Sequence, residues 1–399
     1  MVFPTKKILP IVVAVLIAYA VALQLENSQP ESPATVGASG ASRLSQLLGS
    51  STEEGYETAS EPRSFSFPAD HGPHAGFRNE WWYFTGNLDG ESGERFGYEL
   101  TIFRFSVTPE AAGNRSSNWY SNQVFIGHFA ITDVPGRQFH VADRYSRGSM
   151  GLSGAEAAPF RVWVEDWSVA ADPAAPLSWR MHVADDAIAL DLGLTPLKPP
   201  VLNGQGGLSQ KSAEPGNASF YYSLSRLQTG GSVRIGARRY TVSGLSWMDR
   251  EWSSSALSAR QAGWDWFALQ LDDGSELMFY NLRQLDGSQD PHSAGTWIDA
   301  AGEGSYLGRD EVEIEISDFW DSPLGGRYPM GWRITVPYLG LELDVAAVMT
   351  AQELSTTVRY WEGAVDVTGS RGGDLLEGRG YVELTGYAQT GGSGPADTL

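Results

Sequence analysis

Apolar and polar residues alternate over short stretches between residues 65 and 389, and this alternation predicts β-strands. Residues 95–107 alternate and then change phase, as happens at a β-bulge in a curved sheet. The clearest hairpin joins 264–271 to 276–282 through Asp272-Asp273-Gly274, because an Asp-Gly turn accepts positive φ. Further strands are predicted at residues 123–132, 160–169, 179–190, 220–227, 311–317, 332–336, 342–348, 359–367 and 380–387. Gly- and Asp-rich turns separate these strands, so we expect an all-β fold of antiparallel sandwiches or barrels.

A weak internal repeat indicates that there are two barrels. In residues 86–102 a strand, an acidic glycine-rich turn and an alternating strand follow one another, and residues 264–282 repeat this order. Two consecutive copies of one antiparallel barrel would explain both the repeat and the length of the chain. We place the first barrel at residues 64–250, the second at 251–390 and a flexible tail at 391–399.

Composition supports this architecture and excludes several function classes. A chain of 399 residues that is 42% hydrophobic is too long for one ordinary core, so two domains are expected. The 14 Trp, 16 Tyr, 16 Phe and 46 Gly favour short strands joined by tight turns. A net charge of −20 would repel polyanions, which excludes nucleic acid as a partner. Because the chain has no cysteine, disulfides, thiolate nucleophiles and iron–sulfur clusters are also excluded.

The N-terminus has the order of a secretory signal. Lys6 and Lys7 precede an uncharged apolar run over residues 8–23. As a helix this run would rise about 24 Å, slightly short of the roughly 30 Å hydrocarbon core, so it is either cleaved or retained as an anchor. Residues 1–25 are therefore a predicted signal peptide or membrane anchor, and 26–63 a disordered linker. We expect an exported protein, periplasmic, anchored to the inner membrane facing the periplasm, or secreted.

Two segments bring indole and carboxyl groups together, 244–252 (GLSWMDREW) and 263–287 (GWDWFALQLDDGSELMFYNLRQLDG). Indole faces stabilise cations and bury apolar ligands, while carboxyl groups transfer protons. A carboxyl among tryptophans is desolvated, which favours the neutral form that a general acid needs. The candidate catalytic residues are Asp249, Glu251 and Asp265, and the candidate ligand-binding residues on these segments are Trp247, Trp252, Trp264, Trp266 and Tyr280.

Asp265 also has a structural explanation. On the strand 264–271 it shares a face with Phe267, whereas Trp264 and Trp266 share the other face. Asp265 could therefore pair with an arginine such as Arg250 or Arg283 and close the barrel instead of acting on a substrate.

The strand predicted at 77–85 (FRNEWWYFT) carries further candidates. Glu80 and Trp82 lie on one side of it, and Trp81 and Tyr83 on the other. We include Glu80 and Trp82 as ligand-binding candidates, although a tryptophan at this position commonly closes one end of a barrel by packing. In the segment 360–363 (YWEG), Glu362 is expected to pair with Arg359 or Arg379.

Asp70, His71 and His74 have a spacing that could ligate a metal. An ordered loop capped by histidine hydrogen bonds is the alternative, and Gly72 and Pro73 favour it. We expect neither a metal nor an organic cofactor.

Five segments of the chain resemble the AttH and carotenoid 1,2-hydratase-like family, whose members are often labelled predicted secreted hydrolases. They are residues 71–88 (HGPHAGFRNEWWYFTGNL), 244–252, 263–286, 360–363 and 380–387 (GYVELTGY). The resemblance implies two lipocalin-like β-barrels. It also implies relatives that add water to the terminal isoprene double bond of acyclic carotenoids, and fungal enzymes that fold polyenes in an interdomain pocket. No Gly-x-Ser-x-Gly motif supports the hydrolase label.

The chain departs from the family's hydratases at several positions. Met248 and Arg250 stand where the hydratase and fungal branches carry histidine. Tyr280 is followed by Asn281, where the hydratases have an aspartate. The scaffold is therefore better supported than the activity.

Two functions from different classes follow. The first is an extracytoplasmic lipocalin-like protein that binds a long apolar ligand, an isoprenoid or a lipid, with an envelope transporter as a candidate partner. The second is a hydratase or isomerase that acts on an isoprenoid double bond by carboxylate acid–base catalysis. Carboxyl groups that converge on one apolar cavity of at least ~300 Å³ would favour catalysis, whereas pairing with arginines outside any cavity would favour binding.

Overall fold

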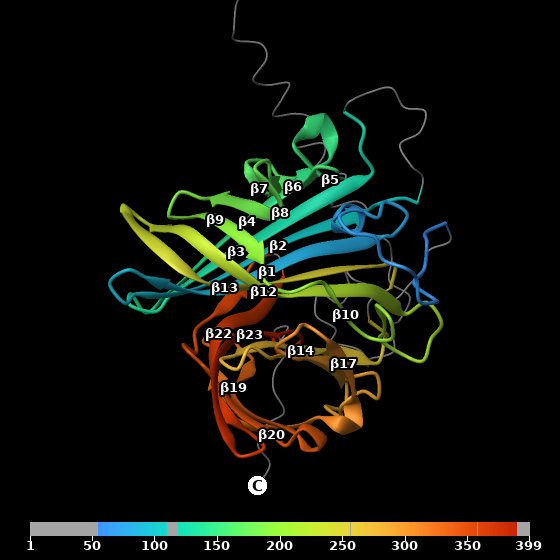
Figure 1. Cartoon of the computed structure of the whole chain (residues 1–399). Helices are drawn as coiled ribbons and strands as arrows, with labels where there is room; N and C mark the ends of the chain where they lie inside the picture. The colour runs from blue at the N-terminus through green and yellow to red at the C-terminus, as the bar shows by residue number, and fades with distance from the viewer. Residues whose placement is uncertain (1–54, 110–118, 256, 357, 389–399) are drawn as a thin grey trace, which may run out of the picture. The chain divides into compact units, whose positions relative to one another are not determined.

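The structure, a computed structural model, describes residues 55–109, 119–255, 257–356 and 358–388 (Figure 1). The predicted signal or anchor segment 1–25, the linker up to residue 54 and the tail 391–399 lie outside the described residues. Within the described part, no helix is both long enough and apolar enough to span a bilayer.

The described residues form two antiparallel sheets in sequence order. The first contains β1 (Asn79–Gly90), β2 (Arg95–Ser106), β3 (Gln123–Asp133), β4 (Gln138–Arg147), β5 (Ser153–Ala157), β6 (Phe160–Val164), β7 (Trp167–Asp172), β8 (Ala175–Ala184), β9 (Ile188–Pro196), β10 (Val201–Leu202), β11 (Leu208–Gln210), β12 (Ala218–Ile235) and β13 (Arg238–Ser253). The second contains β14 (Gln261–Leu271), β15 (Glu276–Gln284), β16 (Ala294–Ile298), β17 (Gly304–Gly308), β18 (Glu313–Asp321), β19 (Arg327–Val336), β20 (Leu341–Ala347), β21 (Glu353–Ser355), β22 (Arg359–Arg371) and β23 (Asp374–Leu384). Short 3₁₀ helices accompany them, η1 (Ala69–His71), η2 (Ser149–Gly151), η3 (Arg309–Glu311) and η4 (Pro337–Leu339).

The two sheets share one topology. The first has the order β4-β3-β2-β1-β13-β12-β9-β8-β7-β6-β5, and the second β17-β16-β15-β14-β23-β22-β20-β19-β18. In each, the last long strand returns to pair with the first, β13 with β1 and β23 with β14. The internal repeat in the sequence therefore corresponds to the hairpins β1–β2 and β14–β15. Each hairpin is the first of its sheet along the chain.

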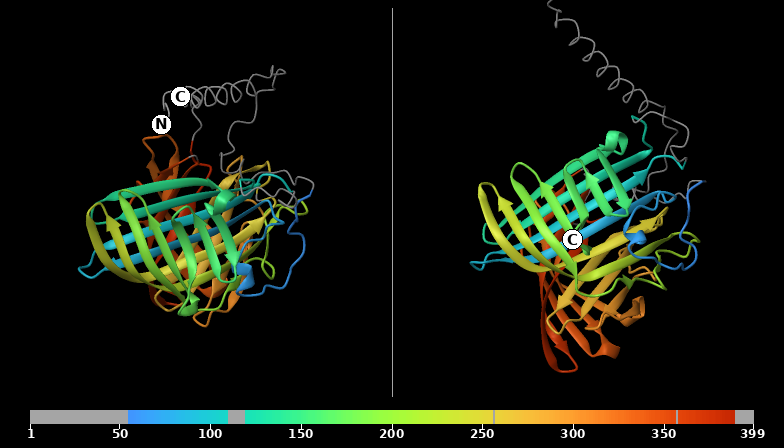
Figure 2. Two further views of the ribbon diagram at one scale, coloured as in Figure 1. Left: turned by 90° about the horizontal axis from the view of Figure 1, so that it is seen from above. Right: turned by 45° about the horizontal axis from the view of Figure 1, so that its top comes forward.

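Both sheets curve. Strands of the second sheet stand around a ring in Figure 1, and Figure 2 shows the long strands of the first sheet side by side in a curved layer. No described pairing joins β4 to β5 or β17 to β18, so each sheet stays open along one side. The predicted all-β class of two consecutive antiparallel barrels is confirmed, with one nearly closed barrel and one half-barrel.

Strand alternation divides the apolar side chains into separate cores. On β1, Trp82 and Phe84 pack into a core inside the first sheet. On β14, Phe267 and Leu269 pack into a core inside the second. A third cluster fills the space between the sheets. It consists of Tyr83, Val201, Tyr221, Trp247, Leu257, Trp266, Ala268, Met278, Tyr280, Leu282, Ala294, Ile298, Ala364 and Tyr381.

This arrangement corrects the predicted bulge in residues 95–107. β2 pairs with β1 and β3 in continuous register, without an irregularity. Its apolar residues change phase because β2 has an apolar environment on both faces: Leu100 and Ile102 face the core of the first sheet, while Phe103 lines the space between the sheets.

Two predicted boundaries also shift. The packed chain begins before Arg63, because the Tyr56 hydroxyl donates to the Ser106 carbonyl (2.7 Å) and Ala59 is buried in the first core. β13 continues to Ser253, so a boundary at 250/251 would cut through it. The connection between the sheets lies instead between Ser253 and Gln261.

Candidate active site

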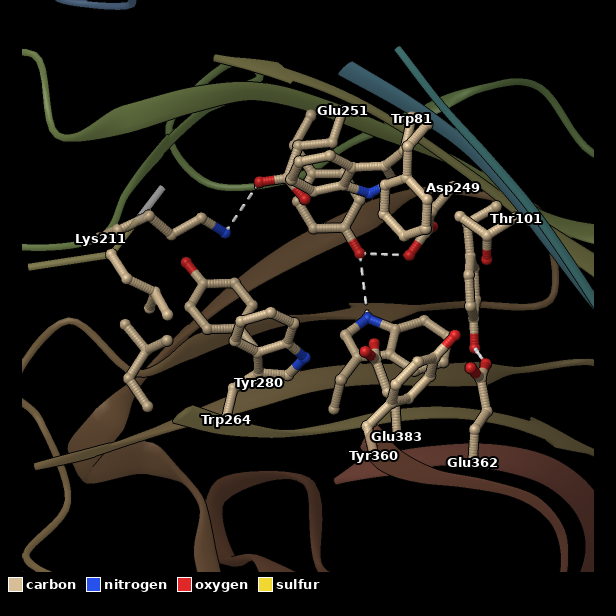
Figure 3. A pocket seen from close by; sticks show the side chains of 16 residues that line it. Trp81, Thr101, Lys211, Asp249, Glu251, Trp264, Tyr280, Tyr360, Glu362 and Glu383 are labelled. Atoms are coloured by element: carbon tan, nitrogen blue, oxygen red, sulfur yellow. Dashed lines mark hydrogen bonds and ion pairs between the residues drawn. The ribbon is translucent and has the colours of Figure 1, made fainter. Parts of the chain in front are cut away.

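A cavity of about 80 Å³ lies between the two sheets (Figure 3). Residues from both sheets line it: Trp81, Tyr83, Thr101, Phe103, Lys211, Tyr221, Asp249, Glu251, Leu257, Trp264, Trp266, Tyr280, Leu282, Tyr360, Glu362 and Glu383. Aromatic rings and carboxyl groups dominate this set, so the cavity can both hold an apolar group and exchange protons with it.

Side chains alternate between the two faces of β13, so the two predicted acids on this strand both face the cavity. Asp249 and Glu251 line it, whereas Met248 and Trp252, on the opposite face, belong to the core of the first sheet. Trp247 is buried next to the cavity and its indole Nε1 donates to the Asp249 Oδ1 (2.6 Å).

Asp249 is the most constrained carboxyl group of the site. Besides Trp247, the hydroxyl groups of Tyr221 and Ser223 donate to it. The Trp266 indole donates to the Tyr221 hydroxyl (3.1 Å), so this chain of hydrogen bonds runs from the second sheet to Asp249 in the first. Burial raises the pKa of Asp249 to about 7, although the three donors oppose the shift. Near neutral pH Asp249 can therefore hold a proton or release it.

A second hydrogen bond between the sheets joins Tyr83 of β1 to Glu362 of β22, with the tyrosine hydroxyl as donor. Glu362 is 1% exposed, and its other oxygen, Oε2, has no hydrogen-bond partner among the described residues. Burial and the nearby carboxyl groups of Glu99 and Glu383 raise the pKa of Glu362 well above its ordinary value. Because a second carboxylate in a dry site is costly, these surroundings favour the protonated form of Glu362.

Glu383 extends the cluster from β23. Burial raises its pKa to about 7, and the charges of Glu251 and Asp249 act in the same direction. A hydrogen bond with Trp264 opposes the shift. Asp249 and Glu383 thus titrate in the same pH range across one cavity, as an acid and a base that exchange roles would.

Lys211 brings the positive charge. Its Nζ lies 3.1 Å from the Glu251 Oε1 and 4.0 Å from the centre of the Tyr280 ring. Burial would lower the pKa of Lys211, but the charge and hydrogen bond of Glu251, together with Tyr280 and Asp249, raise the pKa above the ordinary value. The Ser219 hydroxyl also donates to Glu251, which fixes this end of the cavity.

Asp265, the third predicted catalytic acid, lies outside the cavity. Arg283 Nε is 2.9 Å from its Oδ1, and the Tyr387 hydroxyl donates to its Oδ2 (3.2 Å). Strand alternation explains this position, because Trp264 and Trp266 line the cavity and Asp265 between them must point the other way. The ion pair with Arg283 is the structural alternative predicted from the sequence.

Glu80, Trp82 and Trp252 also lie away from the cavity. Glu80 is fully buried between Arg104 and Arg250; burial alone would raise its pKa, but the two guanidinium groups lower it below the ordinary value. The Arg250 guanidinium lies 4.0 Å from the centre of the Trp82 ring. Trp252 belongs to the core of the first sheet. These three side chains hold one end of the first sheet together.

The segment around His71 and His74 is an ordered loop. His74 Nε2 lies 3.0 Å from the Asp70 Oδ1, and His71 Nδ1 lies 2.6 Å from the Tyr222 hydroxyl. The His74 ring stacks on Trp252 with 3.7 Å between ring centres. Among the described residues, no group of three or more His, Cys, Asp or Glu side chains could hold a metal ion.

Sequence reasoning missed five important residues, Tyr83, Lys211, Tyr221, Glu362 and Glu383. Glu362 pairs with neither arginine that was expected, since Arg359 contacts Glu353 (3.2 Å) and Arg379 contacts Asp89 (2.8 Å). For Glu362 and Glu383 the signal in the sequence was an acid flanked by aromatic and apolar residues on a predicted strand. Of the predicted ligand-binding residues, Trp264, Trp266 and Tyr280 line the cavity.

The fold and the cavity define a class of β-protein with an acid-and-aromatic site between two curved sheets. Residues 58–387 match the AttH-like family model, and the chain belongs to this family. It is similar to a crystal structure assigned as AttH from Nitrosomonas europaea, with 31% identity, a TM-score of 0.72 and coverage of 82% of this chain and 99% of that one.

Two further solved structures share the fold at lower identity. Kievitone hydratase from Nectria haematococca is 15% identical, with a TM-score of 0.64 and coverage of 84% of this chain and 98% of that one. CghA with Sch210972 is 12% identical, with a TM-score of 0.51 and coverage of 87% and 98%. No curated protein matches the sequence.

Proposed function

We propose that the protein is an enzyme of the hydro-lyase type, which adds water to a carbon–carbon double bond of a largely apolar substrate or removes it. The observation that carries the proposal is Asp249, a buried carboxyl with a pKa of about 7 in a cavity walled by Trp264 and Trp266. A structural neighbour named as a hydratase supports the same reaction class.

In the proposed addition, neutral Asp249 transfers its proton to one carbon of the double bond, and the π electrons form the new C–H bond. The other carbon becomes a cation, which the faces of Trp264 and Trp266 stabilise. Tyr221, Ser223 and Trp247 already donate to Asp249, so the carboxylate that remains is stabilised without rearrangement.

Water then attacks the cationic carbon, and Glu383 in its ionised form takes the proton that the water loses. The two acids regain their starting states when one proton passes from Glu383 to Asp249. Burial raises the pKa values of both groups to about 7, so either carboxyl group can hold this proton near neutral pH. The sum is one alkene and one water giving one alcohol, and dehydration runs through the same steps in reverse.

The size of the cavity bears on the choice between the two functions. The carboxyl groups converge on one cavity, as catalysis requires, but its volume of about 80 Å³ is smaller than the ~300 Å³ expected of a site for a long isoprenoid. We therefore restrict the proposed reaction to a compact unsaturated group.

Oxygen exchange on small model substrates tests the proposal. A panel of compact tertiary alcohols and trisubstituted alkenes, with and without an amino group, is incubated with the protein in ¹⁸O-water, and the product mass is measured. We expect ¹⁸O in the alcohol, a loss of at least tenfold in rate in Asp249→Asn, and retention of the rate in Asp265→Asn, a buried aspartate outside the cavity. Equal rates in wild type and Asp249→Asn would refute Asp249 as the general acid. No exchange across the panel would refute the hydro-lyase reaction.

Export stays a proposal that rests on the sequence of residues 1–25 alone. Fractionation of cells followed by N-terminal sequencing would test it. A mature chain that begins after residue 25 in the periplasm supports a cleaved signal, and a chain with its first residues intact in the membrane supports an anchor. Recovery in the cytosol would refute both.

A further inference from the structure

The cavity carries more carboxyl groups than cations to balance them. Of the sixteen described residues that line it, four are acids, Asp249, Glu251, Glu362 and Glu383, and Lys211 is the single cation. Glu99, which raises the pKa of Glu362, is a further buried carboxyl group that does not itself line the cavity. Buried charges and buried polar groups are normally paired, so this imbalance calls for an explanation.

One end of the cavity already holds an ammonium group. Lys211 Nζ is 3.1 Å from Glu251, 4.0 Å from the centre of the Tyr280 ring and 5.3 Å from that of Tyr221. A carboxylate on one side and ring faces on the others form the environment that stabilises a desolvated ammonium group. The protein thus shows, with its own side chain, which charge this cavity accommodates.

The other end of the cavity also has carboxyl groups and aromatic ring faces, but no cation among the described lining residues. Glu362 presents a buried oxygen, Oε2, to which no described residue donates, while its other oxygen accepts from Tyr83. Leaving a buried acceptor unpaired destabilises the empty cavity. Figure 3 shows Glu362 and Glu383 on the same side of the cavity, with Trp264 and Tyr360 among the rings around it. No lysine or arginine among the described lining residues reaches this end.

We infer that the end of the cavity at Glu362 and Glu383 binds a compact organic cation, a protonated or quaternary amine, with its charge at the two carboxyl groups and its carbon atoms against the tryptophan faces. The inference rests on the proposed function in taking this cavity as the substrate site, and it assigns the substrate a basic nitrogen in addition to the double bond. A cation also compensates a carboxylate that is too costly to form in the empty cavity.

Size restricts the ligand further. A cavity of about 80 Å³ accepts an ammonium group with a short carbon skeleton, not a steroid or a long polyamine. The Lys211–Glu251 pair closes the opposite end.

A matched pair of probes tests the inference. Choline and 3,3-dimethyl-1-butanol have the same shape and hydroxyl group, but only choline carries a charge. Binding of each to the full chain is followed by tryptophan fluorescence, to which Trp81, Trp264 and Trp266 at the cavity should respond. We expect choline to bind at least tenfold more tightly, because the carboxyl groups and the desolvated ring faces both favour a cation over an uncharged ligand of the same shape. Equal affinity, or no binding of choline, overturns the inference.

Two variants locate the effect. Glu362→Gln keeps the acceptor for Tyr83 but cannot ionise when a cation binds, and it should lose the preference for choline. Glu377→Gln, an exposed glutamate on β23, is the matched control and should keep it. If Glu362→Gln does not fold, Trp264→Leu replaces it and should weaken choline more than the alcohol. A preference that survives in a folded cavity variant would also overturn the assignment.

The choline and ¹⁸O-exchange experiments test the cation site and the proposed reaction independently. Preference for choline without ¹⁸O exchange in the panel leaves the cation site standing and removes the hydro-lyase. Exchange without any preference for choline leaves the hydro-lyase standing and removes the cation site.

Discussion

The pKa of Asp249 predicts that the carboxyl destabilises the folded protein as the pH rises. In the unfolded chain an aspartate has a pKa of 3.8, whereas burial raises that of Asp249 to about 7. Between these values the unfolded state has lost the proton and the folded state still binds it, so the free energy of unfolding falls with increasing pH. The full shift corresponds to roughly 4 kcal/mol, and about 2.5 kcal/mol of this falls between pH 5 and pH 8.

The measurement compares wild type with Asp249→Asn by urea denaturation at pH 5, 6, 7 and 8. A difference between proteins is needed because His71 and His128, whose pKa values burial lowers to about 4, act in the opposite direction up to about pH 6.5. Whatever the overall stability of the variant, its stability relative to wild type should rise by about 2.5 kcal/mol from pH 5 to pH 8. A constant difference would mean that Asp249 is ionised throughout, which would refute its role as a general acid.

Three other variants probe the arrangement of the site. Asp265→Asn should destabilise the fold by about 3 kcal/mol in urea, because it leaves Arg283 without its buried partner; an unchanged midpoint would contradict that pairing. Gly97→Ala would place a Cβ 2.9 Å from the Tyr381 hydroxyl at the contact between the sheets. It should cost about 1–3 kcal/mol and lower the ¹⁸O-exchange rate, and a variant with wild-type stability and rate would show that the contact is not tight. Lys211→Met should destabilise the fold by about 3 kcal/mol by leaving Glu251 buried without its cation, and a neutral result by urea denaturation would show that water replaces the lysine.

Alternation along single strands predicted much of the fold and part of the site. On β13 it aims Asp249 and Glu251 at the cavity, and on β14 it separates Trp264 and Trp266 from Asp265. These predictions succeed because the alternation is an intrinsic property of an extended chain.

Alternation does not show which face of a strand meets the other sheet. β1 is apolar on both faces, so Glu80 and Trp82 were as plausible as Trp81 and Tyr83, and only the packing of the second sheet decides between them. For the same reason the two apolar faces of β2 resembled a bulge. Glu362 and Glu383 could not be linked to Asp249 from the sequence, because the partners across the cavity are more than a hundred residues away along the chain.

The return of the last strand to the first, in both sheets, has a consequence for the newly made protein. Asn79 at the start of β1 pairs with Ser253 at the end of β13. In the same way, β14 pairs with β23, the last strand of the second sheet. Translation proceeds from the N-terminus, so neither opening hairpin acquires its second neighbour until the last strand of its sheet has left the ribosome. Until then β1 and β14 expose an unpaired backbone edge that can recruit other chains, and a ribosome that stalls shortly before residue 384 would release a protein that tends to aggregate.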